Sequence, residues 1–75
     1  MDKEEIQIRE KIELLKNSIN KIVWIWNAEN HLKKYWSLGH LLEIKDNFGI
    51  VFINGEISNI YIFDIEPYEE WDPND

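Results

Sequence analysis

Residues 49–65 have the sequence GIVFINGEISNIYIFDI, and this stretch decides the fold class. Asn54 and Gly55 separate two apolar runs, Gly49–Ile53 and Ile57–Ile65. Asn-Gly is the pair that a type I′ turn prefers, because both central residues of that turn need a positive φ angle. The stretch therefore predicts two antiparallel strands joined by a two-residue loop.

The two-residue loop also fixes how the strands pair. It places Phe52 opposite Ile57, Ile50 opposite Asn59, and Phe48 opposite Tyr61. The other face of the hairpin is apolar too, with Val51, Ile53, Ile60 and Ile62. Since one helix covers only one face of a sheet, we expect a second helix or a partner subunit on the other face.

A further strand is predicted just before this hairpin, at Leu41–Lys45, with turn chemistry at Asp46-Asn47. We expect a bulge at Ser58-Asn59, and Pro67 ends the sheet. The sequence therefore predicts a three-stranded antiparallel β-meander over residues 40–65.

The chain before the meander is predicted to be helical over residues 2–36. Asp2 is an N-cap, and Glu5 completes a capping box. Apolar residues then recur at alternating spacings of four and three: Ile8, Ile12, Leu15, Ile19, Ile22 and Trp26. This seam packs either on the domain's own sheet or against a second chain, so it is also a candidate dimer seam.

The run Ile22–Trp26 has two interpretations, because five consecutive apolar residues suit either a helix end or a short buried strand. We favour the helix end, followed by a short second helix that ends at Gly39. The apolar face of that second helix consists of Ala28, Leu32, Tyr35 and Trp36. The fold class is thus α+β, with one domain over residues 1–66 and an acidic, aromatic tail over residues 67–75.

The charge is strongly asymmetric along the chain. No basic residue follows Lys45, whereas eight carboxylates do, and the net charge is -7. Asp64 and Glu66 would project from the same face of one strand, about 6.6 Å apart. Aromatic residues flanked by carboxylates suit a partner with an apolar pocket rimmed by Lys and Arg. The candidate partner-binding residues are Asp64, Glu66, Tyr68, Glu69, Glu70, Trp71, Asp72 and Asp75. The alternative is a solvated tail that only keeps the protein in solution.

The sequence offers little for catalysis. It has no Cys and no glycine-rich loop, and neither His31 nor His40 has a metal-ligand motif around it. We therefore expect no enzyme activity, no cofactor and no metal. Direct nucleic-acid binding is also disfavoured, because it needs several cations on one surface.

We expect a small acidic protein that binds and inhibits another protein by covering a basic surface that binds nucleic acid. In character alone, the chain resembles phage anti-defence proteins, including anti-CRISPRs and DNA mimics. The alternatives are an immunity protein or antitoxin that neutralises a basic toxin, and a structural module that self-associates. The N-terminus has no apolar signal region, and the bias toward Ile, Asn and Lys indicates a low-GC bacterium or its phage. We thus expect a location in the bacterial cytoplasm.

Overall fold

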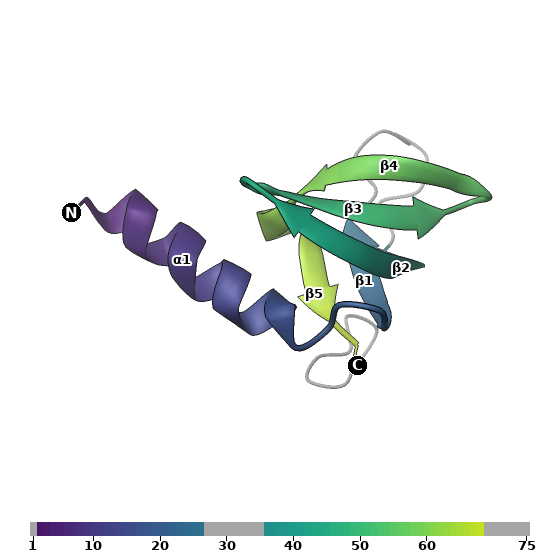
Figure 1. Ribbon diagram of the computed structural model, residues 1–75, viewed down its shortest axis with the longest axis horizontal. Helices are drawn as coiled ribbons and strands as arrows, with labels where there is room; N and C mark the ends of the chain where they lie inside the picture. Colours follow the sequence, from purple (N-terminus) through teal and green to yellow (C-terminus); the bar gives the residue numbers. More distant parts are fainter. Residues whose placement is uncertain (1, 27–35, 69–75) are drawn as a thin grey trace.

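The computed structural model describes residues 2–26 and 36–68. It consists of one N-terminal α-helix and a five-stranded antiparallel sheet in the order β4-β3-β2-β1-β5 (Figure 1). The elements are α1 (Lys3–Lys16), β1 (Ile22–Trp26), β2 (Trp36–Lys45), β3 (Phe48–Ile53), β4 (Glu56–Tyr61), a 3-10 turn η1 (Ile62–Asp64) and β5 (Ile65–Pro67). The α+β class is therefore confirmed, but the sheet has five strands and not three.

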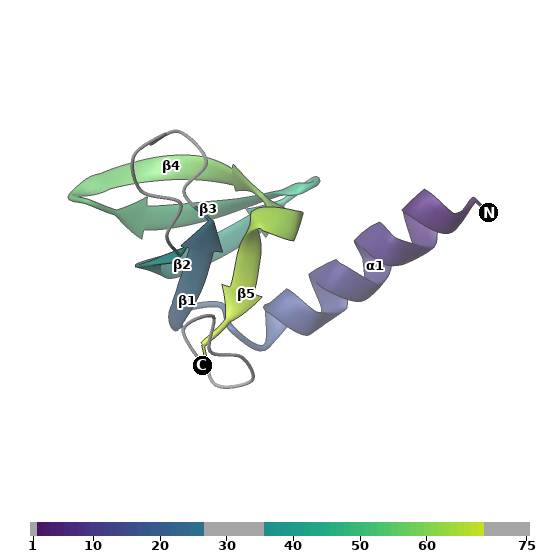
Figure 2. The ribbon, with the colours of Figure 1, turned by 180° about the vertical axis from the view of Figure 1, so that it is seen from behind.

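Helix α1 begins as the sequence predicts. The carboxylate of Asp2 accepts a hydrogen bond from the backbone N–H of Glu5 at 3.0 Å. The helix ends at Lys16, much earlier than predicted, and Asn20 then turns the chain toward β1 with a φ angle of 69°. Figures 1 and 2 show that the N-terminal end of α1 points away from the sheet. Within the described ranges, no helix has the length and apolar character needed to cross a membrane.

The predicted helical region of residues 2–36 is wrong at Ile22–Trp26 and at Trp36, which belong to strands. Residues Ile22–Trp26 form a strand, because their β-branched and aromatic side chains fit a sheet that has neighbours on both edges. Trp36 begins β2, and Gly39 is not a helix stop but a strand residue paired with Val23. The other residues of the predicted second helix, Ala28, Leu32 and Tyr35, lie outside the described residues.

The predicted hairpin is confirmed in register and in turn type. Asn54 and Gly55 have φ angles of 54° and 80°. Phe52 pairs with Ile57, Ile50 with Asn59, and Phe48 with Tyr61. The bulge expected at Ser58-Asn59 is absent from this regular ladder, and the irregularity lies between Leu41 and Glu43 in β2.

The predicted third strand, Ile57–Ile65, is in fact two strands. The chain leaves β4 after Tyr61, turns through η1, and returns as β5 on the far side of β1. The turn places Ile62 and Ile65 in the core, where both are fully buried. Burial of these two side chains removes their apolar surface from water and so stabilises the break in the strand.

The core lies between α1 and one face of the sheet. Its fully buried side chains are Leu15, Val23, Ile25, Leu41, Val51, Ile62 and Ile65. Ile8, Ile12 and Ile19 pack against this cluster. The first four residues of the predicted seam therefore pack on the chain's own core. Ile22 and Trp26 belong to β1, so the six-residue helical seam does not form.

Candidate protein-binding face

The face of the sheet that points away from the core, here called the outer face, exposes large apolar side chains. Side chains alternate between the two faces of a strand, so the neighbours of buried Val23, Leu41 and Val51 point outward. In register, Ile22 pairs with His40, His40 with Phe52, and Phe52 with Ile57. These four residues form a continuous row across β1, β2, β3 and β4, and we call it the outer row.

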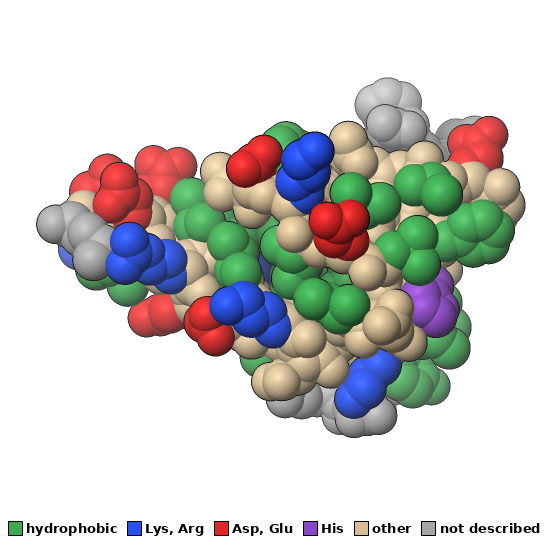
Figure 3. All heavy atoms as spheres, in the orientation of Figure 1, with side chains coloured by type: hydrophobic (Ala, Val, Ile, Leu, Met, Phe, Trp, Pro, Cys, Tyr) green, Lys and Arg blue, Asp and Glu red, His purple; other side chains and the backbone are tan. Residues whose placement is uncertain are grey.

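The outer row is well exposed to solvent. Ile22 is 52% exposed, Phe52 is 47% exposed and Ile57 is 65% exposed. Leu38, two residues from His40 on the same strand face, is 49% exposed. In Figure 3, hydrophobic side chains gather around the histidine on the surface of β2, β3 and β4. The sequence-based expectation that the second face of the sheet is apolar is thus confirmed.

A second group of aromatic residues lies at the other end of β3 and β4. The ring centroids of Phe48 and Tyr61 are 5.9 Å apart, and those of Tyr61 and Phe63 are 5.4 Å apart. All three side chains are exposed by more than a third. The more polar pairs Glu43–Ile50 and Ile50–Asn59 separate this group from the outer row. The outer face therefore has two apolar patches with polar side chains between them.

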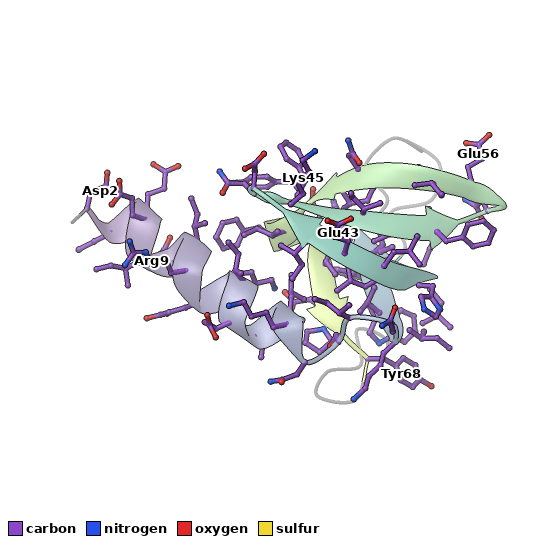
Figure 4. All side chains as sticks on the ribbon, in the orientation of Figure 1. Asp2, Arg9, Glu43, Lys45, Glu56 and Tyr68 are labelled. Atoms are coloured by element: carbon purple, nitrogen blue, oxygen red, sulfur yellow. The ribbon has the colours of Figure 1, made fainter. Side chains whose placement is uncertain are left out.

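A groove of about 600 Å³ runs along the inner side of β4. One wall is β4 itself with the adjoining turns, and the other includes Ile25 and Trp26 of β1. Among the described residues that line the groove, the charged ones are Glu56 and Asp64, both carboxylates. Figure 4 places Glu56 at the β3–β4 end of the sheet, on the opposite side from Tyr68.

A second pocket of about 500 Å³ lies between the end of α1 and the end of β5. Its described lining includes Lys21, His40 and the half-exposed Tyr68, and it holds no carboxylate. Across residues 2–26 and 36–68, no cluster of His, Asp and Glu suits a metal ion. The described lining of this pocket combines hydrogen-bond donors with apolar walls but brings no acid–base pair together.

The described part of the acidic end differs from its predicted arrangement. Asp64 lies in η1 and Glu66 lies in β5. The prediction that both carboxylates project from the same face of one strand is therefore wrong. Glu66 accepts a hydrogen bond from Lys11 Nζ at 2.6 Å, and the Lys11 side chain is only 10% exposed. Glu66 therefore joins α1 to β5 instead of facing a partner freely.

The ring of Tyr68 lies 5.6 Å from that of Trp24, and the residue is 49% exposed. It therefore remains available to a partner. The remaining candidates, Glu69, Glu70, Trp71, Asp72 and Asp75, lie outside the described residues.

Of the outer row, only Ile22 was among the candidate residues taken from the sequence, and there it belonged to the helical seam. The sequence nevertheless held a signal for the outer row, because the hairpin register placed Phe52 opposite Ile57 on a face that one helix could not cover.

In comparisons with known proteins, no family model, no curated protein and no solved structure matches this chain.

Proposed function

We propose that this chain is a small non-enzymatic protein that binds and inhibits another protein by covering a basic surface used for nucleic acid. The observation that carries the proposal is the outer row, whose apolar side chains are 47% to 65% exposed on a chain with a net charge of -7. Large contiguous apolar patches mark interaction sites on small proteins. An apolar centre on a strongly acidic protein fits a partner with an apolar patch surrounded by Lys and Arg.

The charges near the sheet support a basic partner. Glu43, Asp46, Glu56 and Asp64 lie on or beside β2, β3 and β4, where Lys45 is the last cation of the chain. A one-sided negative field speeds the encounter with a positive surface and repels other partners. Protein surfaces that bind nucleic acid carry clustered Lys and Arg, so they are the partner class that this field selects best. Inhibition follows because one surface cannot hold both ligands.

Affinity capture tests this proposal. The protein is immobilised and exposed to lysate of a low-GC bacterium at about 50 mM and about 500 mM salt. We expect a nucleic-acid-binding protein to be retained at low salt and released at high salt. The double variant Phe52→Thr/Ile57→Thr should lose this protein, because Thr keeps the strand propensity but removes the apolar contact.

The matched control is Ile6→Gln, which removes an apolar side chain that is 43% exposed on α1, away from the outer face. It should retain the captured protein. The proposal fails if no nucleic-acid-binding protein is retained, or if the double variant retains it as well as the parent does.

An immunity protein or antitoxin would use the same electrostatics against a basic toxin. Two findings would favour an immunity protein or antitoxin: a toxin gene beside this gene, and loss of that toxin's toxicity when the two proteins are co-expressed.

Self-association is the second candidate function, and the exposed outer face is the observation that favours it. Two copies could bury their outer rows against each other, although a charge of -7 on each copy opposes this. Sedimentation velocity at about 10 to 100 µM protein shows whether the chain self-associates or stays a monomer. A single species with the mass of one chain, 9.1 kDa, would exclude the self-associating module.

A further inference from the structure

Along β4, every second residue points its backbone hydrogen-bonding groups away from β3, toward the outer edge of the described sheet. β4 is the last strand of the sheet and pairs only with β3 among the described strands. In a hairpin with a two-residue loop, the pair next to the loop is hydrogen-bonded, and bonded pairs then alternate along the strands. Glu56, Ser58 and Ile60 therefore bond to β3. The N–H groups of Ile57, Asn59 and Tyr61 and the C=O groups of Ile57 and Asn59 point to the outer edge of β4, whereas the C=O of Tyr61 caps η1.

This edge lacks the features by which proteins usually block further strand pairing. The β4 sequence EISNIY contains no Lys and no Pro, and its ladder with β3 is free of bulges. The opposite edge is different, because β5 has only three residues, includes Pro67, and lies beside α1. Among the described strands, β4 is thus the edge that is suited to accept another strand.

The surroundings of the β4 edge define what kind of strand fits. Ile57 and Tyr61 offer apolar contacts on the outer side, and Ile60 does so on the groove side. Glu56 lies at one end of β4, and Asp64 lies beyond the other end. An extended segment with apolar side chains in its middle and Lys or Arg at its ends complements this arrangement. The β4 edge of a second copy carries Glu56, with Asp64 beyond its end, and no cation, so pairing two β4 edges does not supply the basic ends.

We propose that a basic partner adds an extended segment to the free edge of β4 as a sixth strand. Backbone hydrogen bonds to Ile57, Asn59 and Tyr61 hold the segment, and Glu56 and Asp64 select its basic ends. Strand addition is an established way for a sheet edge to bind a peptide, with main-chain bonds giving affinity and alternate side chains giving specificity. This inference rests on the proposed function and specifies how its partner docks.

The test uses a synthetic peptide of alternating Val and Thr with two Lys at each end, capped by acetyl and amide groups. Amide hydrogen exchange is measured by NMR on the full chain. Without peptide, the amides of Ile57, Asn59 and Tyr61 should exchange much faster than those of Ser58 and Ile60. With peptide, the three edge amides should slow by at least about tenfold, since each gains a hydrogen bond. Binding without this protection, or no binding, would overturn strand addition.

Two controls sharpen the result. Asn59→Pro removes one edge N–H but none that bonds to β3, and Pro is tolerated on edge strands. It should weaken peptide binding about tenfold relative to Asn59→Ala, which keeps the N–H. A peptide with Glu in place of Lys should not bind. Equal affinities for the two Asn59 variants, or binding of the Glu peptide, would contradict the proposal.

The oligomeric state is measured in the same samples. Protection of the edge amides without peptide, together with a doubled mass, would show that a second copy occupies β4 and would overturn the basic partner. If the peptide test fails, affinity capture can still retain a partner, because the outer row binds it without strand addition. The two proposals therefore fail separately.

Discussion

At the residue scale, Gly39 shows how closely the inner face of the sheet is packed. A Cβ atom at this position would collide with Cδ1 of Ile25 and would lie 3.3 Å from the carbonyl oxygen of Phe52. We expect Gly39→Ala to lower the free energy of unfolding by about 1 to 3 kcal/mol through overpacking. Adding Ile25→Val removes the colliding Cδ1 atom, so the double variant should lose less than the sum of the two single variants. Urea denaturation measures all three.

Gly55 is a useful contrast, because an added Cβ there meets nothing within 4 Å. Its φ angle of 80° makes Ala unfavourable through backbone strain alone, at about 1 to 2 kcal/mol. A recovery of stability on adding Ile25→Val to Gly55→Ala would contradict the steric explanation for Gly39.

The second prediction at the residue scale concerns the ion pair between Lys11 and Glu66, which we expect to stabilise the fold. Glu66→Gln leaves the largely buried Lys11 ammonium without its carboxylate, so we expect a loss of about 1 to 3 kcal/mol in the free energy of unfolding. Glu13 forms a comparable bond to Lys16, but both side chains are more than half exposed, so Glu13→Gln is the matched control. It should change stability by less than about 0.5 kcal/mol. Similar losses for both variants would refute a structural role specific to Glu66.

At the element scale, α1 is held to the core by residues after its first turn. Leu15 is fully buried and Ile8 packs on the core, whereas Ile6 in the first turn is 43% exposed. We expect Leu15→Ala to lower the free energy of unfolding by about 2 to 5 kcal/mol and Ile6→Ala by less than about 0.5 kcal/mol. Thermal unfolding followed by circular dichroism checks this. A large effect of Ile6→Ala would mean that the first turn of the helix also packs on the core.

Local patterns in the sequence predicted some elements well. Asn54-Gly55 was sufficient for the hairpin and its register, and Asp2 with Glu5 was sufficient for the helix start. These features depend on neighbouring residues only. In contrast, Ile22–Trp26 suits a helix or a strand, and pairing with β2 and β5 decides the outcome. The break at Ile62–Asp64 likewise depends on burial of Ile62 in a core made by distant segments.

The candidate site was predicted less well, for the same reason. Charge along the chain indicated the acidic end, but the ion pair of Glu66 with Lys11 spans 55 positions and leaves no local signal. The outer row requires the order of four strands, and β1 was predicted only as the alternative to a helix end. The hairpin alone indicated an uncovered apolar face without showing its extent.

At the scale of the whole molecule, we propose that folding and partner binding use different sides of one sheet. The inner face holds the buried core, whereas Phe52 and Ile57 are 47% and 65% exposed on the outer face. The double variant Phe52→Thr/Ile57→Thr should therefore change the free energy of unfolding by less than about 1 kcal/mol while abolishing partner capture. Urea denaturation and affinity capture, measured on the same preparation of the double variant, test whether stability and partner binding are separate. Loss of both together would mean that the outer row serves folding.

The central claim is that the protein occupies a nucleic-acid-binding surface of its partner. The most direct measurement is the affinity for the captured partner, determined by calorimetry with increasing amounts of that partner's own nucleic acid. Competition for one surface predicts that the apparent Kd rises in proportion to the nucleic-acid concentration, without a ternary complex. An apparent Kd that stays constant as the nucleic acid saturates the partner would contradict the claim.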